Sequence, residues 1–118
     1  MKKVYVAGPY SCVGRCEGAG VSLDAMRQGL LVSAKLLDLG YAPFSPWLDY
    51  LYHFLGERPP KRENYYAVGI EWLRVSDAML VVELRATSKG TKREIEEAKL
   101  YRIPIYYSLE EFLSKEEP

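Results

Sequence analysis

The stretch DAMLVVELRATSKGTKREIEEA, residues 77–98, joins an apolar run to a charged segment through a loop that contains Ser and Gly. The run 77–84 is apolar on both faces, which is typical of a buried strand in a parallel sheet. The segment 90–102 carries its apolar residues at helical spacing. A buried strand followed by an amphipathic helix is half of a βαβ unit, so this stretch predicts an α/β domain.

The same alternation continues on both sides of this stretch. Further strands are predicted at 3–8, 41–45 and 103–108. Helices are predicted from a Ser22 cap to Gly40, where a left-handed residue should end the helix, and over 46–56, 64–75 and 109–113. Strands that alternate with helices pair in parallel through right-handed crossovers. We therefore expect one domain over 1–118, a small doubly wound three-layer sandwich. Its four or five parallel strands should follow the order 2-1-3-4, as in flavodoxin or Rossmann folds.

The composition limits the classes of partner. The chain has 118 residues, 48% of them hydrophobic, and 16 basic residues balance 16 acidic ones. A net charge of zero gives no basic surface for a nucleic-acid polymer, and no apolar run is long enough for a membrane span. Two cysteines do not make a disulfide framework, so we expect a cytoplasmic protein. Cys12, Cys16 and His53 lack a second ligand pair, so neither a metal site nor a cofactor is predicted.

The predicted topology indicates where a ligand binds. In open parallel sheets, ligands bind beyond the carboxyl ends of the strands, where the strand order switches. The switch lies here between the first and third strands, and the loops GPYSCVGRCEGAG and ELRATSKGT follow them. Both loops lead into helix N-termini, whose backbone N–H groups favour phosphate. A phosphorylated small molecule is the expected ligand.

Two side chains in SKGTKREIEEA have both a structural and a functional interpretation. Thr91 and Glu94 fit a capping box, in which Thr caps the helix and Glu reaches back to it. Glu94 is also a carboxylate at the ligand end of the sheet, where it could attack an electrophilic carbon. Ser88 could bind phosphate, or it could simply be a loop residue.

Three motifs together resemble a known family. VYVAGPYS at 4–11, EWLRVSDAMLVV at 71–82 and SKGTKREIEEA at 88–98 are similar to the nucleoside 2-deoxyribosyltransferase-like superfamily. That superfamily includes 2′-deoxynucleoside 5′-phosphate N-hydrolases and small phage and bacterial proteins. The resemblance covers most of the chain, and the S-x-G-x-x-x-E element, which contains Gly90, is its most specific part.

The resemblance implies a role for each matching residue. Glu94 would be the nucleophile that attacks the anomeric carbon and displaces the base, and Ser88 would hold the 5′ phosphate. The Gly8-Pro9-Tyr10 turn, with Ser11 in the loop after it, would border base and sugar, and Tyr10 would lie near the reacting carbon. The resemblance also implies a homodimer or a higher homo-oligomer.

One position departs from the family pattern. Family members usually carry an Asp in V-D-L-E-W-L, whereas this chain reads VGIEWL, with Gly69 at that place. That Asp helps to protonate the leaving base or to orient the sugar in the family. Glu71 and Asp49 are the candidates to replace it.

The predicted function is N-glycosidic cleavage of a nucleoside or nucleoside 5′-monophosphate through a covalent glycosyl-Glu94 intermediate. Two alternatives are kept. One is 2-deoxyribosyl transfer between bases. The other is a non-catalytic nucleotide-binding or regulatory protein that has lost its acid at position 69.

Overall fold

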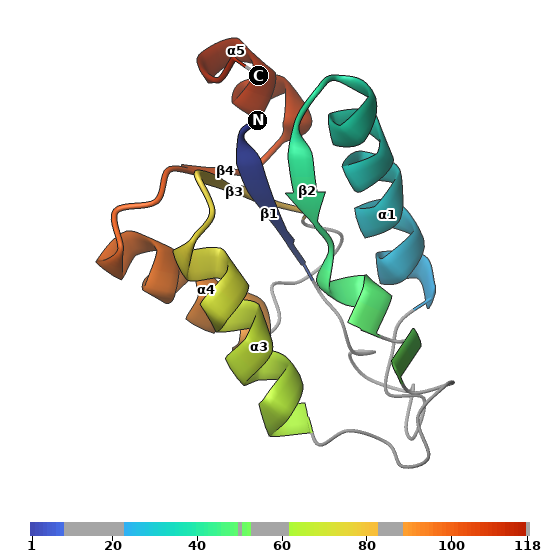
Figure 1. Cartoon of the computed structure of the whole chain (residues 1–118), viewed down its shortest axis with the longest axis vertical. Coiled ribbons are helices and arrows are strands. Elements are labelled where there is room, and N and C mark those ends of the chain that lie inside the picture. The colour runs from blue at the N-terminus through green and yellow to red at the C-terminus, as the bar shows by residue number, and fades with distance from the viewer. Residues whose placement is uncertain (9–22, 50, 53–61, 83–88, 118) are drawn as a thin grey trace.

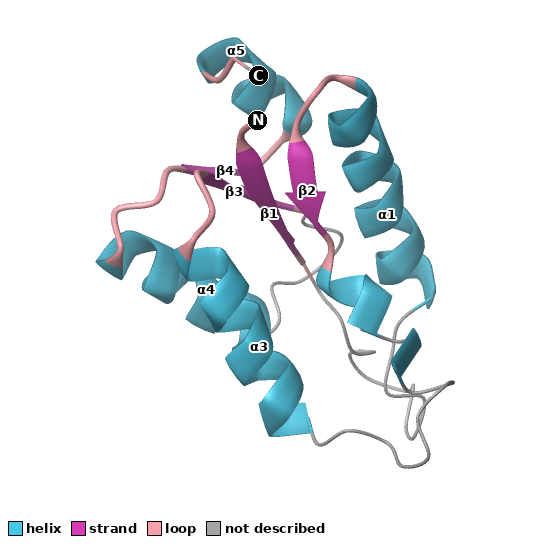
Figure 2. Cartoon of the chain, viewed as in Figure 1, coloured by secondary structure: helices cyan, strands magenta, loops and turns pink. Residues whose placement is uncertain are grey.

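The computed structural model describes residues 1–8, 23–49, 51–52, 62–82 and 89–117. The elements in chain order are β1 (Lys3–Ala7), α1 (Leu23–Asp38), β2 (Ala42–Phe44), the 3₁₀-helix η1 (Pro46–Asp49), α3 (Arg62–Arg74), β3 (Ala78–Val81), α4 (Lys89–Leu100), β4 (Ile105–Tyr106) and α5 (Leu109–Lys115). Figure 2 shows helices packed on both sides of a central sheet. In the described part of the chain, no helix is both long enough and apolar enough to cross a membrane.

The sheet confirms the predicted α/β topology. Its four described strands follow the order β2-β1-β3-β4. All three pairings are parallel, with Lys3 opposite Ala42, Val4 opposite Ala78 and Met79 opposite Ile105. The strands are shorter than the apolar runs that predicted them, because the ends of those runs continue into turns or lie outside the described residues.

The two faces of the sheet each have a hydrophobic core. Successive side chains of a strand point to opposite faces. Val4 and Val6 therefore pack towards α1 and α5, whereas Tyr5 and Ala7 pack towards α3 and α4. Figure 1 shows the same arrangement, with α1 and α3 on opposite sides of β1. Burial on both faces explains why β1 and β3 read as continuous apolar runs.

Left-handed residues end two of the helices. After α1, Gly40 has φ 92°. Its N–H donates to the Leu37 carbonyl at 3.1 Å, and the Tyr41 N–H donates to Leu36 at 3.0 Å. This pair of bonds is a Schellman motif and confirms the predicted helix end. Arg102 closes α4 in the same way with φ 57°, although it has a side chain.

The predicted helix over 46–56 begins instead as the 3₁₀-helix η1. Trp47 gives a physical reason, because its indole is only 2% exposed and packs where two glycines leave room. A Cβ on Gly29 of α1 would lie 2.3 Å from the Trp47 ring, and one on Gly8 would lie 3.0 Å from it. The tight turn places this large side chain directly after β2, against the end of β1.

The amino end of the sheet is closed by paired polar groups. Glu116 accepts hydrogen bonds from Lys2 and from the Tyr106 hydroxyl, both at 2.6 Å. Asp77 accepts from the Lys3 N–H at 2.8 Å, and its own N–H donates to the Lys3 carbonyl at 2.8 Å. These bonds tie the C-terminal segment and the start of β3 to the segment at the start of β1.

Candidate active site

Three elements converge at the carboxyl end of the sheet. Gly8 follows β1, η1 follows β2, and α4 begins after the segment that follows β3. The backbone at Gly8 is closely surrounded, since a Cβ there would lie 2.7 Å from the Val82 carbonyl oxygen. This is the edge where open parallel sheets bind ligands.

Glu94 lies on α4 and contacts the central strand. Its carboxyl accepts a hydrogen bond from the hydroxyl of Tyr5, which is in β1. Its Oε2 atom is buried and has no hydrogen-bond partner among the described residues. The bond from Tyr5 thus leaves Oε2 without a described donor. Buried polar atoms are rarely left without a partner, and such atoms are often found where a protein binds or reacts.

The surroundings of Glu94 hold a proton on it to an unusually high pH. Burial raises the pKa of Glu94 from 4.5 to about 7, against the opposing effect of the Tyr5 hydrogen bond. The pKa of Tyr5 is raised well above its ordinary value by burial, then by the charge of Glu94 and the bond between them. The Tyr5 hydroxyl thus remains a donor while Glu94 titrates near neutrality.

The capping-box interpretation of Glu94 does not match the helix. α4 begins at Lys89, two residues before Thr91, so Thr91 lies inside the first turn and is not the N-cap. Thr91 is also buried, with 1% exposure. The Glu94 carboxyl accepts a hydrogen bond from the Tyr5 hydroxyl, whereas the capping box predicted a bond from the backbone N–H of the cap residue.

Tyr5 is a site residue that the sequence analysis missed. Its ring stacks on Phe44 of β2 with centroids 5.5 Å apart, and Phe44 stacks on Trp72 of α3 at 5.6 Å. This three-ring stack holds the hydroxyl beside Glu94. A sign of its role was present in the sequence, because a Tyr within an aliphatic buried strand needs a partner for its hydroxyl. The expected Tyr, Tyr10, lies outside the described residues.

Gly69 lies against the same hydroxyl. A Cβ at this position of α3 would lie 2.8 Å from the Tyr5 oxygen, which is too close for any side chain without a shift. The Asp expected from the family pattern would therefore collide with the group that binds Glu94. The absence of a side chain at 69 makes room for the bond between Tyr5 and Glu94.

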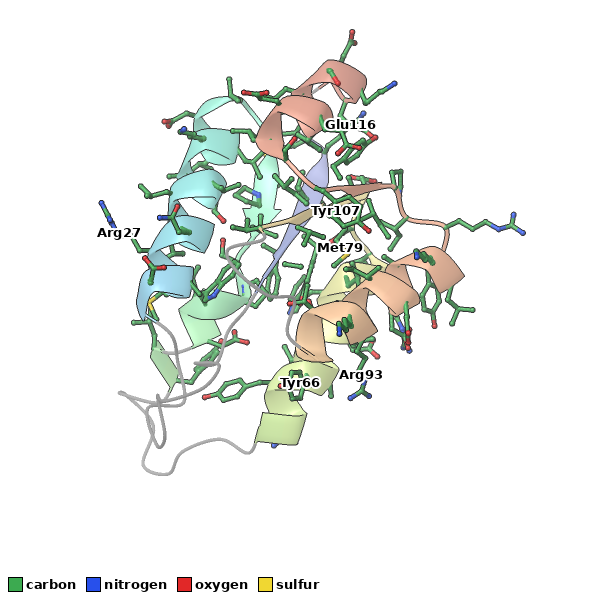
Figure 3. The ribbon with its side chains drawn as sticks, turned by 180° about the vertical axis from the view of Figure 1, so that it is seen from behind. Arg27, Tyr66, Met79, Arg93, Tyr107 and Glu116 are labelled. Atoms are coloured by element: carbon green, nitrogen blue, oxygen red, sulfur yellow. The ribbon has the colours of Figure 1, made fainter. Side chains whose placement is uncertain are left out.

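Gly90 brings the two helices of this face together. It lies one turn before Glu94 on α4, and a Cβ there would lie 2.8 Å from the ring of Tyr66 on α3. Figure 3 shows Tyr66 on α3 beside the start of α4. Gly90 thus allows the close approach of α3 and α4 at the site.

The two replacement acids have different surroundings. Glu71 is exposed on α3 and forms an ion pair with Arg74 at 2.8 Å, so the structure does not bring it to Glu94. Asp49 of η1 is only 8% exposed, and its burial raises its pKa to about 6. Its charge also contributes to the raised pKa values of Tyr5 and of Tyr65 on α3. The charge of Asp49 thus acts on Tyr5, whereas Glu71 is an exposed residue paired with Arg74.

Several predicted residues cannot be placed. Pro9, Tyr10, Ser11 and Ser88 lie outside the described residues, as do the cysteines and His53. Within the described ranges, no three His, Cys, Asp or Glu side chains form a group that could hold a metal ion.

Comparison with known proteins places the chain in a family without giving it an activity. No curated protein matches the chain. No solved structure matches it either. One family model, described as a domain of unknown function (DUF7768), matches residues 2–108. Because this match spans most of the 118 residues, the chain belongs to the DUF7768 family.

Proposed function

We propose that this protein cleaves the N-glycosidic bond of a nucleoside 5′-monophosphate, with Glu94 as the nucleophile. The single observation that carries the proposal is the Glu94 carboxyl in the first half of α4, beside the Tyr5 hydroxyl of β1. One of its oxygens is held by Tyr5, and the other is buried without a partner among the described residues. A positioned carboxylate of this kind can form a covalent bond to an anomeric carbon.

The chemistry follows the retaining glycosidase scheme. Glu94 Oε2 attacks the anomeric carbon, and the bond from that carbon to the base nitrogen breaks. Water then attacks the same carbon and releases Glu94 with the sugar phosphate as product. The Tyr5 hydroxyl favours the ionised Glu94, because a hydrogen bond to a carboxylate stabilises its charged form.

The surroundings of Glu94 favour an enzyme over a binding protein. A binding protein with a structural Glu94 would use this side chain in its capping box, with no second acid nearby. Instead, the helix begins before Thr91, Glu94 is bound to Tyr5, and the Asp49 carboxyl acts on the same Tyr5. Burying a carboxyl oxygen without a partner among the described residues is unfavourable for folding, which supports a functional role for Glu94.

Release of free base from nucleotides tests the proposal. The protein would be incubated with nucleosides and 5′-monophosphates, both ribo and deoxy, with and without a second free base, and products would be read by mass spectrometry. Base release that requires Glu94 supports the proposal. The reactions that contain a second free base distinguish hydrolysis from transfer, because only transfer forms a new nucleoside or nucleotide. A protein that binds a nucleotide and releases no base from any substrate is a binding protein, and the proposal is then wrong.

The proposal includes a homo-oligomer in the cytoplasm. Val68 and Trp72 on α3, with Val75 directly after it, form an exposed apolar stripe at the spacing of one helix face. A second copy of the chain could cover this stripe. Light scattering of the purified protein would give its mass, and a monomer at micromolar concentration would contradict this part.

A further inference from the structure

The chemistry of the departing base decides which groups the proposed reaction needs beside Glu94. A neutral base leaves as an anion unless it receives a proton, and general acid help is commonly worth about a hundredfold or more. A base whose ring carries a fixed positive charge leaves as a neutral molecule and needs no proton. The side chains around Glu94 therefore indicate which class of base suits the site.

Helix α3 offers no acid to this part of the site. A Cβ on Gly69 would lie 2.8 Å from the Tyr5 hydroxyl oxygen, so the α3 position that faces this hydroxyl has no side chain and no room for one. Glu71, two residues further along α3, is exposed and forms an ion pair with Arg74 at 2.8 Å. Its carboxyl group is thus held by Arg74 at the surface of the helix.

Few groups act on Glu94 itself. Tyr5 donates a hydrogen bond to its carboxyl, and among the described residues neither a second carboxyl group nor a cation shifts its pKa. The charge of Asp49 acts on Tyr5 and Tyr65 but not on Glu94. The pKa of Tyr5 is raised well above its ordinary value, mainly by burial, so its hydroxyl is a poor acid near neutral pH. Among the described residues, the surroundings of Glu94 therefore provide no general acid.

Glu94 also lacks an opposite charge in the described part of the chain. The two ion pairs that the described residues form both lie elsewhere, at the amino end of the sheet and on the surface of α3. The Glu94 Oε2 atom is buried and has no hydrogen-bond partner among these residues. A buried carboxylate is unfavourable without an opposite charge, and an opposite charge within about 4–6 Å favours ionisation. A cationic substrate would therefore ionise its own nucleophile when it binds, whereas a neutral substrate would not.

We infer that the substrate of this site is a nucleoside 5′-monophosphate whose base carries a positive charge in the ring joined to the sugar, as in a pyridinium or an N7-alkylated purine nucleotide. This inference rests on the proposed function. A Glu94 carboxylate oxygen bonds to the anomeric carbon, and the electron pair of the broken carbon–nitrogen bond neutralises the ring. The base leaves uncharged and takes no proton. Water then attacks the same carbon, its proton passes to solvent, and the Glu94 carboxylate is released.

A panel of cationic and neutral nucleotides tests the substrate class with wild-type protein, so the test does not depend on any variant folding. The cationic members are nicotinamide mononucleotide and N7-methylguanosine 5′-monophosphate, and the neutral members are cytidine and guanosine 5′-monophosphates. The 2′-deoxy form of each would be included. Reactions would be run at pH 6, where the methylated base keeps its charge.

The quantity to compare is the acceleration of base release by the protein. Each rate would be divided by the rate in buffer alone, because a charged base also leaves faster without protein. The acceleration should be about a hundredfold or more larger for a cationic nucleotide than for either neutral one, which corresponds to the acid help that a neutral base would need.

Variants and binding connect this preference to Glu94. Glu94→Gln should abolish the acceleration, and Glu71→Gln, which changes the exposed acid of α3, should leave it unchanged. N7-methylguanosine and guanosine 5′-monophosphates differ by one methyl group and its charge. Calorimetry should show that wild-type protein binds the methylated nucleotide more tightly. Glu94→Gln, with its folding checked by circular dichroism, should lose this preference.

Different results overturn different parts of the account. A neutral nucleotide that is accelerated as much as the cationic ones would overturn the substrate class and leave the proposed function in place. Loss of the acceleration in Glu71→Gln would show that a protein acid takes part, and it would overturn the substrate class too. Equal binding of the two guanosine nucleotides by wild-type protein would do the same. A wild-type protein that releases base from no nucleotide would overturn the proposed function, and the substrate class with it.

Discussion

Two glutamates at opposite ends of the sheet have opposite surroundings. Glu116, at the amino end, has its pKa lowered by hydrogen bonds from Lys2 and then from Tyr106. Glu94, at the carboxyl end, has its pKa raised to about 7 by burial, with Tyr5 as its one described partner. Figure 3 shows Glu116 beside α5, far from Tyr66 and the start of α4.

The difference shows how this small domain divides its tasks. At the amino end, hydrogen bonds from Lys2 and Tyr106 stabilise the charge of Glu116, so its ionisation supports the fold. At the carboxyl end, ionisation of Glu94 works against the fold, because a charge is created in a buried place. A group that opposes folding in this way is reactive when a substrate supplies its missing partner.

The largest expected effect is on catalysis. Glu94→Gln removes the nucleophile and should lower base release by about a thousandfold or more, as found when a covalent catalyst is lost. Glu97→Gln is the matched control, since Glu97 lies one turn further along α4 and also has a buried Oε2 without a partner among the described residues. If both variants lose activity equally, position 94 has no special role.

The same Glu94→Gln change should make the folded state more stable above neutral pH. The folded pKa of about 7 exceeds the ordinary 4.5, so the protonated form supports folding below pH 4.5 and this support is lost as pH rises through 7. At pH 8 the carboxylate costs about 3 kcal/mol, which a neutral Gln avoids. Urea unfolding at pH 8 and pH 4.5 should show this gain only at pH 8.

Exposed Glu96 on the same helix provides the control for this stability measurement. Glu96→Gln should leave the free energy of unfolding nearly unchanged at both pH values. A Glu94→Gln variant that is no more stable than wild type at pH 8 would show that Glu94 is better solvated than the structure indicates.

At the amino end of the sheet, replacing a glutamate by glutamine should have the opposite effect on the free energy of unfolding. Glu116→Gln removes the negative charge that accepts from Lys2 and Tyr106, and it should lower the free energy of unfolding at pH 7 by about 1 kcal/mol. The folded pKa of Glu116 is below the ordinary value, so this loss is present above pH 4.5 and disappears as pH falls through the folded pKa. Thermal unfolding at pH 7 and pH 3 would measure it, and an equal loss at both would contradict the account.

The smallest expected effect concerns the end of α4. Arg102 has φ 57°, a conformation that costs about 1 kcal/mol for a residue with a side chain. Arg102→Gly should remove this cost and stabilise the protein by about 0.5 kcal/mol after the greater freedom of Gly in the unfolded chain is counted. Gly40→Ala at the equivalent position after α1 should destabilise it. The urea unfolding midpoints of both variants would show whether Arg102→Gly stabilises the protein and Gly40→Ala destabilises it.

Much of the fold could be predicted because its main determinants are local in the sequence. The apolar runs of β1 and β3 indicated a sheet covered on both faces, and the alternation of elements indicated the strand order. Gly40 indicated where α1 ends. The turn at Pro46–Asp49 could not be predicted in the same way, because Trp47 is placed by Gly8 and Gly29, which are distant in the sequence.

The candidate site was only partly predictable for the same reason. Glu94 could be found from a local motif. Its bond to Tyr5 joins residues far apart in the chain, and neither residue alone indicates the other. Gly69 appeared in the sequence only as a missing acid, whereas in the structure a Cβ at this position would lie 2.8 Å from the Tyr5 hydroxyl oxygen. The burial of Asp49 depends on tertiary packing and has no local pattern.

Detection of a covalent intermediate on Glu94 tests the central claim most directly. The protein would be mixed with a 2′-fluoro nucleoside 5′-monophosphate, whose fluorine slows breakdown of the intermediate, and then digested for mass spectrometry. The account predicts a sugar phosphate attached to the peptide that contains Glu94, and no such adduct in Glu94→Gln. Base release by Glu94→Gln at the wild-type rate, or an adduct on another residue, would contradict it.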